Sequence, residues 1–182
     1  VGAARATTLV YSGGAAFVIL DDRHERVNFT PARSALRQAL YRHYTVDWNE
    51  TYLLVEAGTP VATVIGRYFA LDRDKRWDRV SQAYAAMAEA QGPRFADPAA
   101  AVAAAYAAGK FDEFVPPSVI GDYQGMQDGD AILSFNFRAD RIREILAALL
   151  DPAFDGFPRT RVIRFAAAAG MTRYSDALAP FL

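Results

Sequence analysis

Cysteine is absent from the 182-residue chain, and histidine occurs only at His24 and His43. Without thiols the chain can form neither a disulfide framework nor a cysteine-ligated metal site. A protein metal site needs several ligands held together, and we interpret both histidines as surface or helix residues rather than ligands. We therefore predict no metal ligand and no catalytic residue in this chain.

Long apolar runs are also missing. No stretch reaches the roughly 18 apolar residues that a membrane-spanning helix needs. Residues 1–14 lack the basic start and apolar block of a signal peptide. The formal net charge of -1 argues against a surface that binds nucleic acid through its overall charge. These absences predict a cytoplasmic protein with neither membrane nor nucleic acid as a partner.

Apolar residues make up 52% of the chain and aromatic residues 13%, which allows a sizeable core and indicates a globular protein. Its 20 basic residues include only two lysines, Lys75 and Lys110. Arginine presents a rigid fork that matches carboxylate and phosphate geometry, although a coding bias toward Arg and Ala explains the general excess equally well. Only the placement of individual arginines can therefore indicate a function.

Short apolar runs alternate with longer helical patterns along the chain. The runs predicted as strands are 15–20, 51–55, 61–65, 131–135 and 161–165. The patterns predicted as helices cover 30–43, 74–90, 98–108 and 140–150. This alternation is typical of an α/β fold with a mostly parallel sheet and helices on both faces. No linker divides the chain, so we predict a single domain over residues 1–182, with a surface loop at 116–130.

The stretch "GRYFALDRDKRWDRV", residues 66–80, holds four arginines, one lysine and three aspartates. Arg67 follows a predicted strand, and Arg73 precedes a predicted helix start at Asp74. The carboxyl ends of strands and the amino ends of helices are both places where α/β proteins bind anions. The charges could equally neutralise one another on a solvated turn, and this stretch alone leaves both interpretations open.

A second stretch, "DGDAILSFNFRADRIREI" at residues 128–145, repeats the arrangement. Arg138 follows another predicted strand, and Arg141 comes three residues later, on the same face of the helix start. Two strand ends thus each deliver two arginines to one edge of the sheet. This repetition favours an anion site formed by Arg67, Arg73, Arg138 and Arg141.

These two stretches, with "DEFVPPSVIGD" at 112–122 and "LLDPAFDGF" at 149–157, resemble the inserted substrate-handling domain of the 2,3-bisphosphoglycerate-independent phosphoglycerate mutases. The segment "MTRYSDAL" at 171–178 is similar to the family's return toward its phosphatase-like domain. The resemblance covers about residues 61–180, and residues 1–60 match only weakly.

The resemblance implies a glycolytic enzyme that interconverts 3-phosphoglycerate and 2-phosphoglycerate. It implies that Arg67, Arg73, Arg138 and Arg141 bind the substrate, because they match the family's substrate arginines. It further implies two manganese ions and a phosphorylated serine in a second, phosphatase-like domain, whose ligands this chain lacks. We therefore expect a fragment of that enzyme that is inactive by itself.

One departure from the family pattern supports another hypothesis. In "VNFTPARSAL", residues 27–36, Asn28 and Phe29 stand where the family has an Arg-Asp pair. The alternative function is a stand-alone, non-catalytic module that binds small phosphorylated acids. A third is an interaction domain in which the arginines only form ion pairs.

Overall fold

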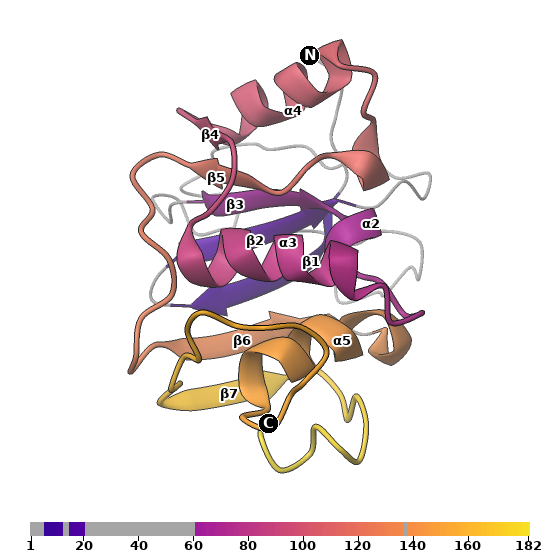
Figure 1. Cartoon of the computed structure of the whole chain (residues 1–182), viewed down its shortest axis with the longest axis vertical. Helices are drawn as coiled ribbons and strands as arrows, with labels where there is room; N and C mark the ends of the chain where they lie inside the picture. Colours follow the sequence, from indigo (N-terminus) through magenta and orange to yellow (C-terminus); the bar gives the residue numbers. More distant parts are fainter. Residues whose placement is uncertain (1–5, 13–14, 21–60, 137) are drawn as a thin grey trace, which may run out of the picture.

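The computed structural model describes residues 6–12, 15–20, 61–136 and 138–182. Seven described strands form one sheet in the order β4-β5-β3-β2-β1-β6-β7. The strands, in chain order, are β1 (Ala6–Ser12), β2 (Ala15–Leu20), β3 (Val61–Gly66), β4 (Arg94–Phe95), β5 (Ser118–Ile120), β6 (Ala131–Phe135) and β7 (Ala167–Gly170). Figure 1 shows the sheet with α3 and α5 lying across it.

The sheet is mixed, which corrects the prediction of a mostly parallel one. The pairs β2–β3, β4–β5 and β6–β7 are parallel, whereas β1–β2, β1–β6 and β3–β5 are antiparallel. The sequence pattern missed β1, which pairs with β2 across only two intervening residues and so must run antiparallel to it. The α/β class is confirmed, and the single domain over residues 1–182 stays a prediction.

The described helices are α2 (Arg67–Ala70), α3 (Trp77–Glu89), α4 (Pro98–Ala107) and α5 (Ala139–Leu150), with a 3-10 turn, η1, at Asp112–Phe114. Helices α3 and α5 pack in a cluster that includes Ile65 and Val119, and α4 packs in another with Val64 and Ile120. Successive residues of a strand point to opposite faces, so the helices cover both faces of the sheet, as predicted.

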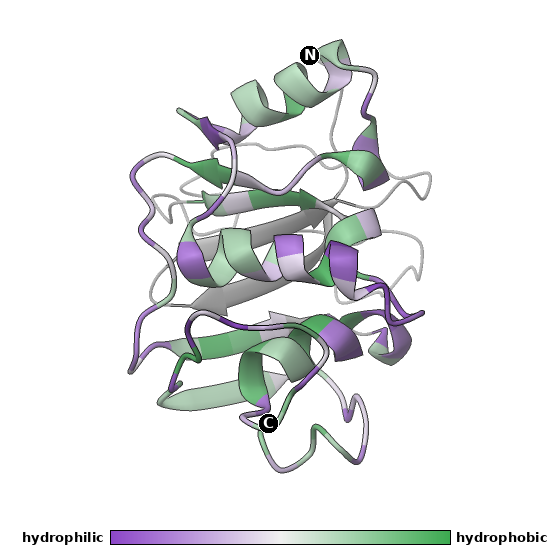
Figure 2. Ribbon diagram, in the orientation of Figure 1, coloured by the Kyte–Doolittle hydropathy of each residue, from purple (hydrophilic) through white to green (hydrophobic). Residues whose placement is uncertain are grey.

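The amphipathic patterns of α3 and α5 point inward as expected. Figure 2 shows apolar colour along β3, β5 and β6, and polar colour on the loop between α2 and α3. Trp77, which was predicted to face inward, is only partly buried and packs against the core between these helices and the sheet. The other side chains predicted to face inward are almost fully buried: Val80, Tyr84, Met87, Ile142, Ile145, Leu146 and Leu149. Burial of these stripes fixes how the two helices lie on the sheet.

Two helix starts test the predicted caps. Asp97 accepts a hydrogen bond from the Ala100 amide at 2.8 Å and starts α4, as its Asp-Pro sequence indicates. Helix α3 starts at Trp77 and not at Asp74, because Lys75 has a left-handed φ of 56° that a helix cannot continue through.

Two other predicted elements are wrong, and two lie outside the described residues. The segment 161–165 is not a strand, and residues 118–120 of the predicted loop form the buried strand β5. The predicted helix at 30–43 and strand at 51–55 lie outside the described residues. Among the described helices, none is long and apolar enough to cross a membrane.

Candidate anion-binding site

Strands β3 and β6 bring the two arginine-bearing stretches to one edge of the sheet. Strand β3 runs parallel to β2, β2 antiparallel to β1, and β1 antiparallel to β6, so β3 and β6 run the same way. Two strands, β2 and β1, lie between β3 and β6, so three interstrand spacings separate their carboxyl ends by roughly 14 Å. The shared edge predicted from the sequence is therefore confirmed, but loops and long side chains must span the distance.

Arg67 is held at the end of β3 by η1. A Cβ atom on Gly66 would lie only 2.2 Å from the carbonyl oxygen of Glu113, so only glycine allows this approach. The Gly66 amide donates to the Val115 carbonyl oxygen at 2.8 Å. This contact brings the Glu113 carboxylate into an ion pair with the Arg67 guanidinium, whose side chain is 16% exposed.

The loop between α2 and α3 carries Arg73 and is organised by the buried Asp72. Its carboxylate accepts hydrogen bonds from the amides of Asp74 at 2.9 Å and Arg76 at 2.8 Å. Arg79 pairs with the same carboxylate at 3.6 Å, and its guanidinium stacks on a neighbouring tyrosine ring. The Arg79 side chain is therefore structural, which is the neutralised-turn interpretation for that part of the stretch.

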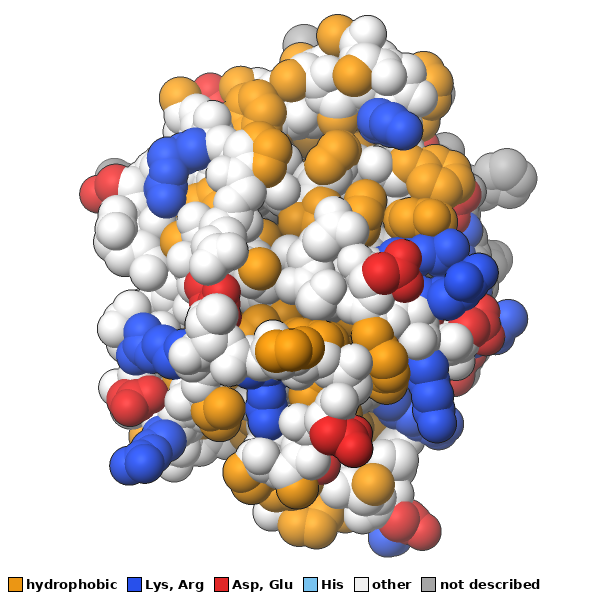
Figure 3. Space-filling view, viewed as in Figure 1, with side chains coloured by type: hydrophobic (Ala, Val, Ile, Leu, Met, Phe, Trp, Pro, Cys, Tyr) orange, Lys and Arg blue, Asp and Glu red, His pale blue; other side chains and the backbone are white. Residues whose placement is uncertain are grey.

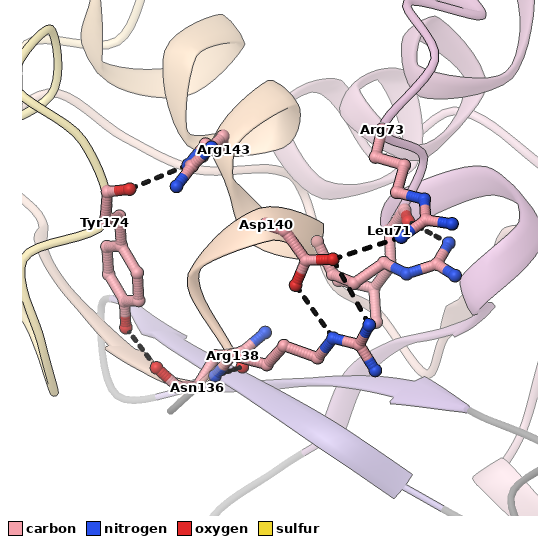
Figure 4. A network of polar contacts seen from close by, with 8 residues as sticks. Leu71, Arg73, Asn136, Arg138, Asp140, Arg143 and Tyr174 are labelled. Atoms are coloured by element: carbon pink, nitrogen blue, oxygen red, sulfur yellow. Dashed lines mark hydrogen bonds and ion pairs between the residues drawn. The ribbon is translucent and has the colours of Figure 1, made fainter.

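Asp140 joins the two stretches. Its Oδ1 accepts from Arg138 Nε at 2.7 Å, and its Oδ2 accepts from Arg138 Nη2 at 3.2 Å and from Arg73 Nη1 at 3.3 Å. Figure 4 shows both guanidinium groups pointing at this carboxylate. The side chains of Arg73 and Arg138 remain 49% and 46% exposed, so a dissolved ligand can reach both.

Arg141 lies one turn along α5 from Arg138. Its Nη1 donates to the Leu71 carbonyl oxygen at 3.4 Å, which places it beside the loop that carries Arg73. We call Arg73, Arg138, Arg141 and Asp140 the arginine cluster. Two guanidinium groups bond to the Asp140 carboxylate and the charge of a third, that of Arg141, acts on it, so the cluster itself carries a net positive charge.

The charges of the cluster act on the pKa of Asp140. The hydrogen bond from Arg138 is the largest influence, and with the hydrogen bond from Arg73 and the charge of Arg141 it holds the pKa of Asp140 below its ordinary value. Partial burial opposes this shift. The carboxylate is therefore ionised at neutral pH and keeps the guanidinium groups together.

A second acidic residue of α5 has the opposite shift. Glu144 accepts a hydrogen bond from the Lys75 amide at 2.9 Å, which fastens the Arg73 loop to α5. Burial raises the pKa of Glu144 above its ordinary value, and the nearby Asp72 and Asp74 carboxylates add to the shift. Figure 3 shows acidic and basic side chains interleaved on the side where α2 and the starts of α3 and α5 lie.

The structure thus gathers three of the four predicted arginines at Asp140 and pairs the fourth, Arg67, with Glu113. Sequence reasoning missed both carboxylates. Asp140 could have been found, because it lies between Arg138 and Arg141 in the motif "FRADR". No local signal indicates Glu113, which depends on the approach of η1 to Gly66.

The cluster is suited to a small anion with more than one charged group. Guanidinium forks bind carboxylate and phosphate oxygens in pairs of hydrogen bonds. Helices α3 and α5 both begin in this region, with Arg76 and Arg138 as their N-cap residues, and helix starts carry partial positive charge. Among the described residues, no group of three or more His, Cys, Asp and Glu side chains could hold a metal ion.

Fold and site together define an α/β domain with an arginine-rich sheet edge, the kind of site that binds anionic small molecules. Residues 40–176 match the family described as BPG-independent PGAM N-terminus. The chain belongs to this family, the N-terminal region of the 2,3-bisphosphoglycerate-independent phosphoglycerate mutases.

Individual relatives agree with this assignment. The chain is 69% identical over 119 residues to the 2,3-bisphosphoglycerate-independent phosphoglycerate mutase of Rhodopseudomonas palustris, an alignment covering 65% of this chain and 24% of that protein. The Gluconobacter oxydans enzyme of the same name is 53% identical over 122 residues, covering 67% of this chain and 24% of its own length. The chain thus spans about a quarter of the length of the curated relatives it matches.

A solved structure extends the likeness to the fold. Leishmania mexicana phosphoglycerate mutase, crystallised at low cobalt concentration, superposes with a TM-score of 0.60 at 26% identity. The match covers 83% of this chain and 28% of that one. The α/β fold described above is therefore that of a phosphoglycerate mutase segment.

Proposed function

We propose that this chain is the part of a 2,3-bisphosphoglycerate-independent phosphoglycerate mutase that binds phosphoglycerate through arginines. In this proposal Arg73, Arg138 and Arg141 bind the carboxylate and phosphate groups of 2- and 3-phosphoglycerate, and Arg67 completes the site from the end of β3. The observation that carries the proposal is the convergence of Arg73 and Arg138 on Asp140, which lies 67 residues from Arg73 in the sequence. The names of the relatives supply the substrate.

The chain's contribution to the isomerisation is positioning and charge neutralisation. A phosphoglycerate whose phosphoryl group moves between neighbouring hydroxyls must be held while its charge redistributes. Fixed guanidinium groups supply both effects without covalent chemistry. We assign no catalytic nucleophile and no general base to this chain.

The proposal includes a second domain of the same enzyme, of phosphatase type, with manganese as its cofactor and the cytoplasm as its location. The described residues group no three possible metal ligands, so they do not fit a manganese site. We assign no metal-dependent step to the described residues. The metal and the phosphorylated serine belong to the partner domain.

Calorimetric titration of 3-phosphoglycerate into the 182-residue chain tests the proposal. Arg73→Ala, Arg138→Ala and Arg67→Ala should each weaken binding at least about tenfold, because each removes a fork from the ligand. Arg173→Ala is the matched control, since Arg173 forms an exposed ion pair with Asp176 elsewhere on the chain. No binding by the unaltered chain at millimolar ligand, or equal losses in the control, would contradict the proposal.

A further inference from the structure

A buried tyrosine ties the C-terminal segment to the end of β6. Tyr174 is 1% exposed, and its hydroxyl lies 2.6 Å from the Asn136 carbonyl oxygen and 2.9 Å from the Ser134 carbonyl oxygen. It also lies 3.2 Å from Ser134 Oγ and accepts the Met171 amide at 3.2 Å. One hydroxyl proton is therefore shared between two carbonyl oxygens at the point where the chain leaves the sheet.

The ring and backbone of Tyr174 are fixed as well. A Cβ atom on Gly170 would lie 2.4 Å from the ring, so β7 ends directly against it. Arg143 Nε of α5 donates to the Tyr174 carbonyl oxygen at 2.7 Å. Tyr174 thus connects three elements, β6, β7 and α5.

Arg138 is two hydrogen bonds away from this hydroxyl. The Asn136 residue that bonds to Tyr174 through its carbonyl oxygen also accepts the Arg138 amide on its Oδ1 at 2.7 Å. Figure 4 shows the chain of contacts running from Tyr174 through Asn136 to Arg138 and Asp140. This hydrogen bond holds the Arg138 backbone amide, beside the Cα atom from which the Arg138 side chain leaves.

The position of Arg138 cannot be fixed by its ion pair alone. Arg138 and Asp140 are both partly exposed, and exposed pairs hold their geometry only weakly. The bonds of Tyr174 are buried, where hydrogen bonds are stronger and costly to leave unmade. The rigid part of the site is therefore the Tyr174 end of the chain of contacts.

We propose that Tyr174 is a positioning residue, which fixes the end of β6 so that Arg138 is held in place for an anionic ligand. The ligand part of this inference rests on the proposed phosphoglycerate function. In this proposal Tyr174 does not bind the ligand itself and acts through Asn136 and Arg138.

The test is Tyr174→Phe, which removes only the hydroxyl. Its first measurement is the Arg138 Nε–H resonance in an NMR spectrum, assigned by its loss in Arg138→Ala. We expect this resonance to shift or broaden in Tyr174→Phe. Tyr84→Phe is the matched control, because Tyr84 is also buried and donates its hydroxyl to a backbone carbonyl, that of Arg161.

The second measurement is the affinity for 3-phosphoglycerate. Tyr174→Phe should weaken binding about tenfold, the effect of losing one well-made hydrogen bond, while Tyr84→Phe stays within about twofold. In an Arg138→Ala background, Tyr174→Phe should have no further effect, because its influence passes through Arg138. An additive loss in that background would overturn the proposal.

A second, milder variant keeps the test possible if Tyr174→Phe does not fold. If Tyr174→Phe does not fold, Arg143→Met removes the exposed donor to the Tyr174 carbonyl and should shift the Arg138 resonance in the same direction, less strongly. An unchanged resonance in every folded variant overturns the positioning role. Failure of the unaltered chain to bind phosphoglycerate contradicts the proposed function instead, and the resonance comparison still decides whether Tyr174 positions Arg138.

Discussion

The arginines at the two ends of helix α5 have different kinds of hydrogen-bond partner. Near its C-terminus, Arg159 Nη1 donates to the carbonyl oxygens of Ala148 and Asp151, both at 2.9 Å, and Nη2 donates to those of Pro152 and Phe154 at 3.1 and 3.2 Å. Helix ends leave their last carbonyl groups without partners inside the helix. Arg159 supplies those partners for the end of α5 and for the loop that follows.

At the start of α5, by contrast, Arg73 and Arg138 share the single carboxylate of Asp140 and remain about half exposed. A guanidinium group surrounded by backbone carbonyls has its hydrogen-bond capacity filled by the fold. A guanidinium group beside an exposed carboxylate can still exchange partners with a dissolved anion. The two ends of α5 therefore differ: the fold engages Arg159 at one end, whereas Arg73 and Arg138 stay accessible to a dissolved anion at the other.

The largest expected effect is on stability at the C-terminal end. Arg159→Met should lower the free energy of unfolding by about 3 kcal/mol, because four carbonyl groups lose a charged donor. Urea denaturation measures this change. Arg164→Met, on the exposed side of the same segment, is the control and should change stability by less than about 0.5 kcal/mol. If Arg138→Ala destabilised the fold as much as Arg159→Met, the distinction would be wrong.

A smaller effect is expected at Asp140. Asp140→Asn should lower the free energy of unfolding at pH 7 by about 0.5 to 1 kcal/mol, the scale of a solvent-screened ion pair. Because the folded-state pKa of Asp140 is lowered, its contribution is complete above the ordinary aspartate value near about 3.9 and disappears as pH falls through the folded-state pKa.

Denaturation curves at several pH values check this prediction. The difference between the unaltered chain and Asp140→Asn should shrink toward zero in acid. Asp176→Asn, which alters an exposed ion pair away from the cluster, should show almost no difference at any pH. A gap between the unaltered chain and Asp140→Asn that widened in acid would contradict the assignment.

The smallest expected effect is a gain, not a loss, in the free energy of unfolding. Glu144→Gln keeps the Oε1 acceptor for the Lys75 amide but removes a charge that burial disfavours. The folded-state pKa of Glu144 is raised, so ionising Glu144 costs stability. This cost is absent below the ordinary glutamate pKa of about 4.3 and grows as the pH rises toward the raised pKa. We expect Glu144→Gln to be about 0.5 kcal/mol more stable at pH 7 and no more stable at pH 3. Thermal unfolding at both pH values measures this, and a loss of stability at pH 7 would rule out the charge penalty.

The local sequence pattern correctly predicted the strands and helices whose apolar spacing is regular. Strands β2 and β6 have the predicted bounds, β3 extends one residue further, and α5 starts one residue earlier. Their apolar spacing matches the period of the element, and burial of that face then stabilises it. The Asp-Pro start of α4 likewise needed no tertiary information.

The predicted strand at 161–165 failed for a physical reason. The segment does bury one apolar residue, Ile163, in the core. Its backbone, however, makes isolated bonds instead of a ladder: the Arg161 carbonyl accepts the Tyr84 hydroxyl, and the Arg164 carbonyl accepts the Gly129 amide. The strand forms instead at Ala167–Gly170, where weak β-formers pair with β6.

By itself, the sequence determined the α/β class, most of the described helices and core, and the stretches that carry the arginines, because these depend on spacing within short segments. Only the tertiary structure decided that the sheet is mixed and that β3 and β6 end at the same edge. It also decided which arginines are exposed beside one carboxylate and which are engaged by the fold. Those outcomes depend on partners up to about 70 residues apart, such as Arg73 with Asp140, and no local pattern specifies such distances.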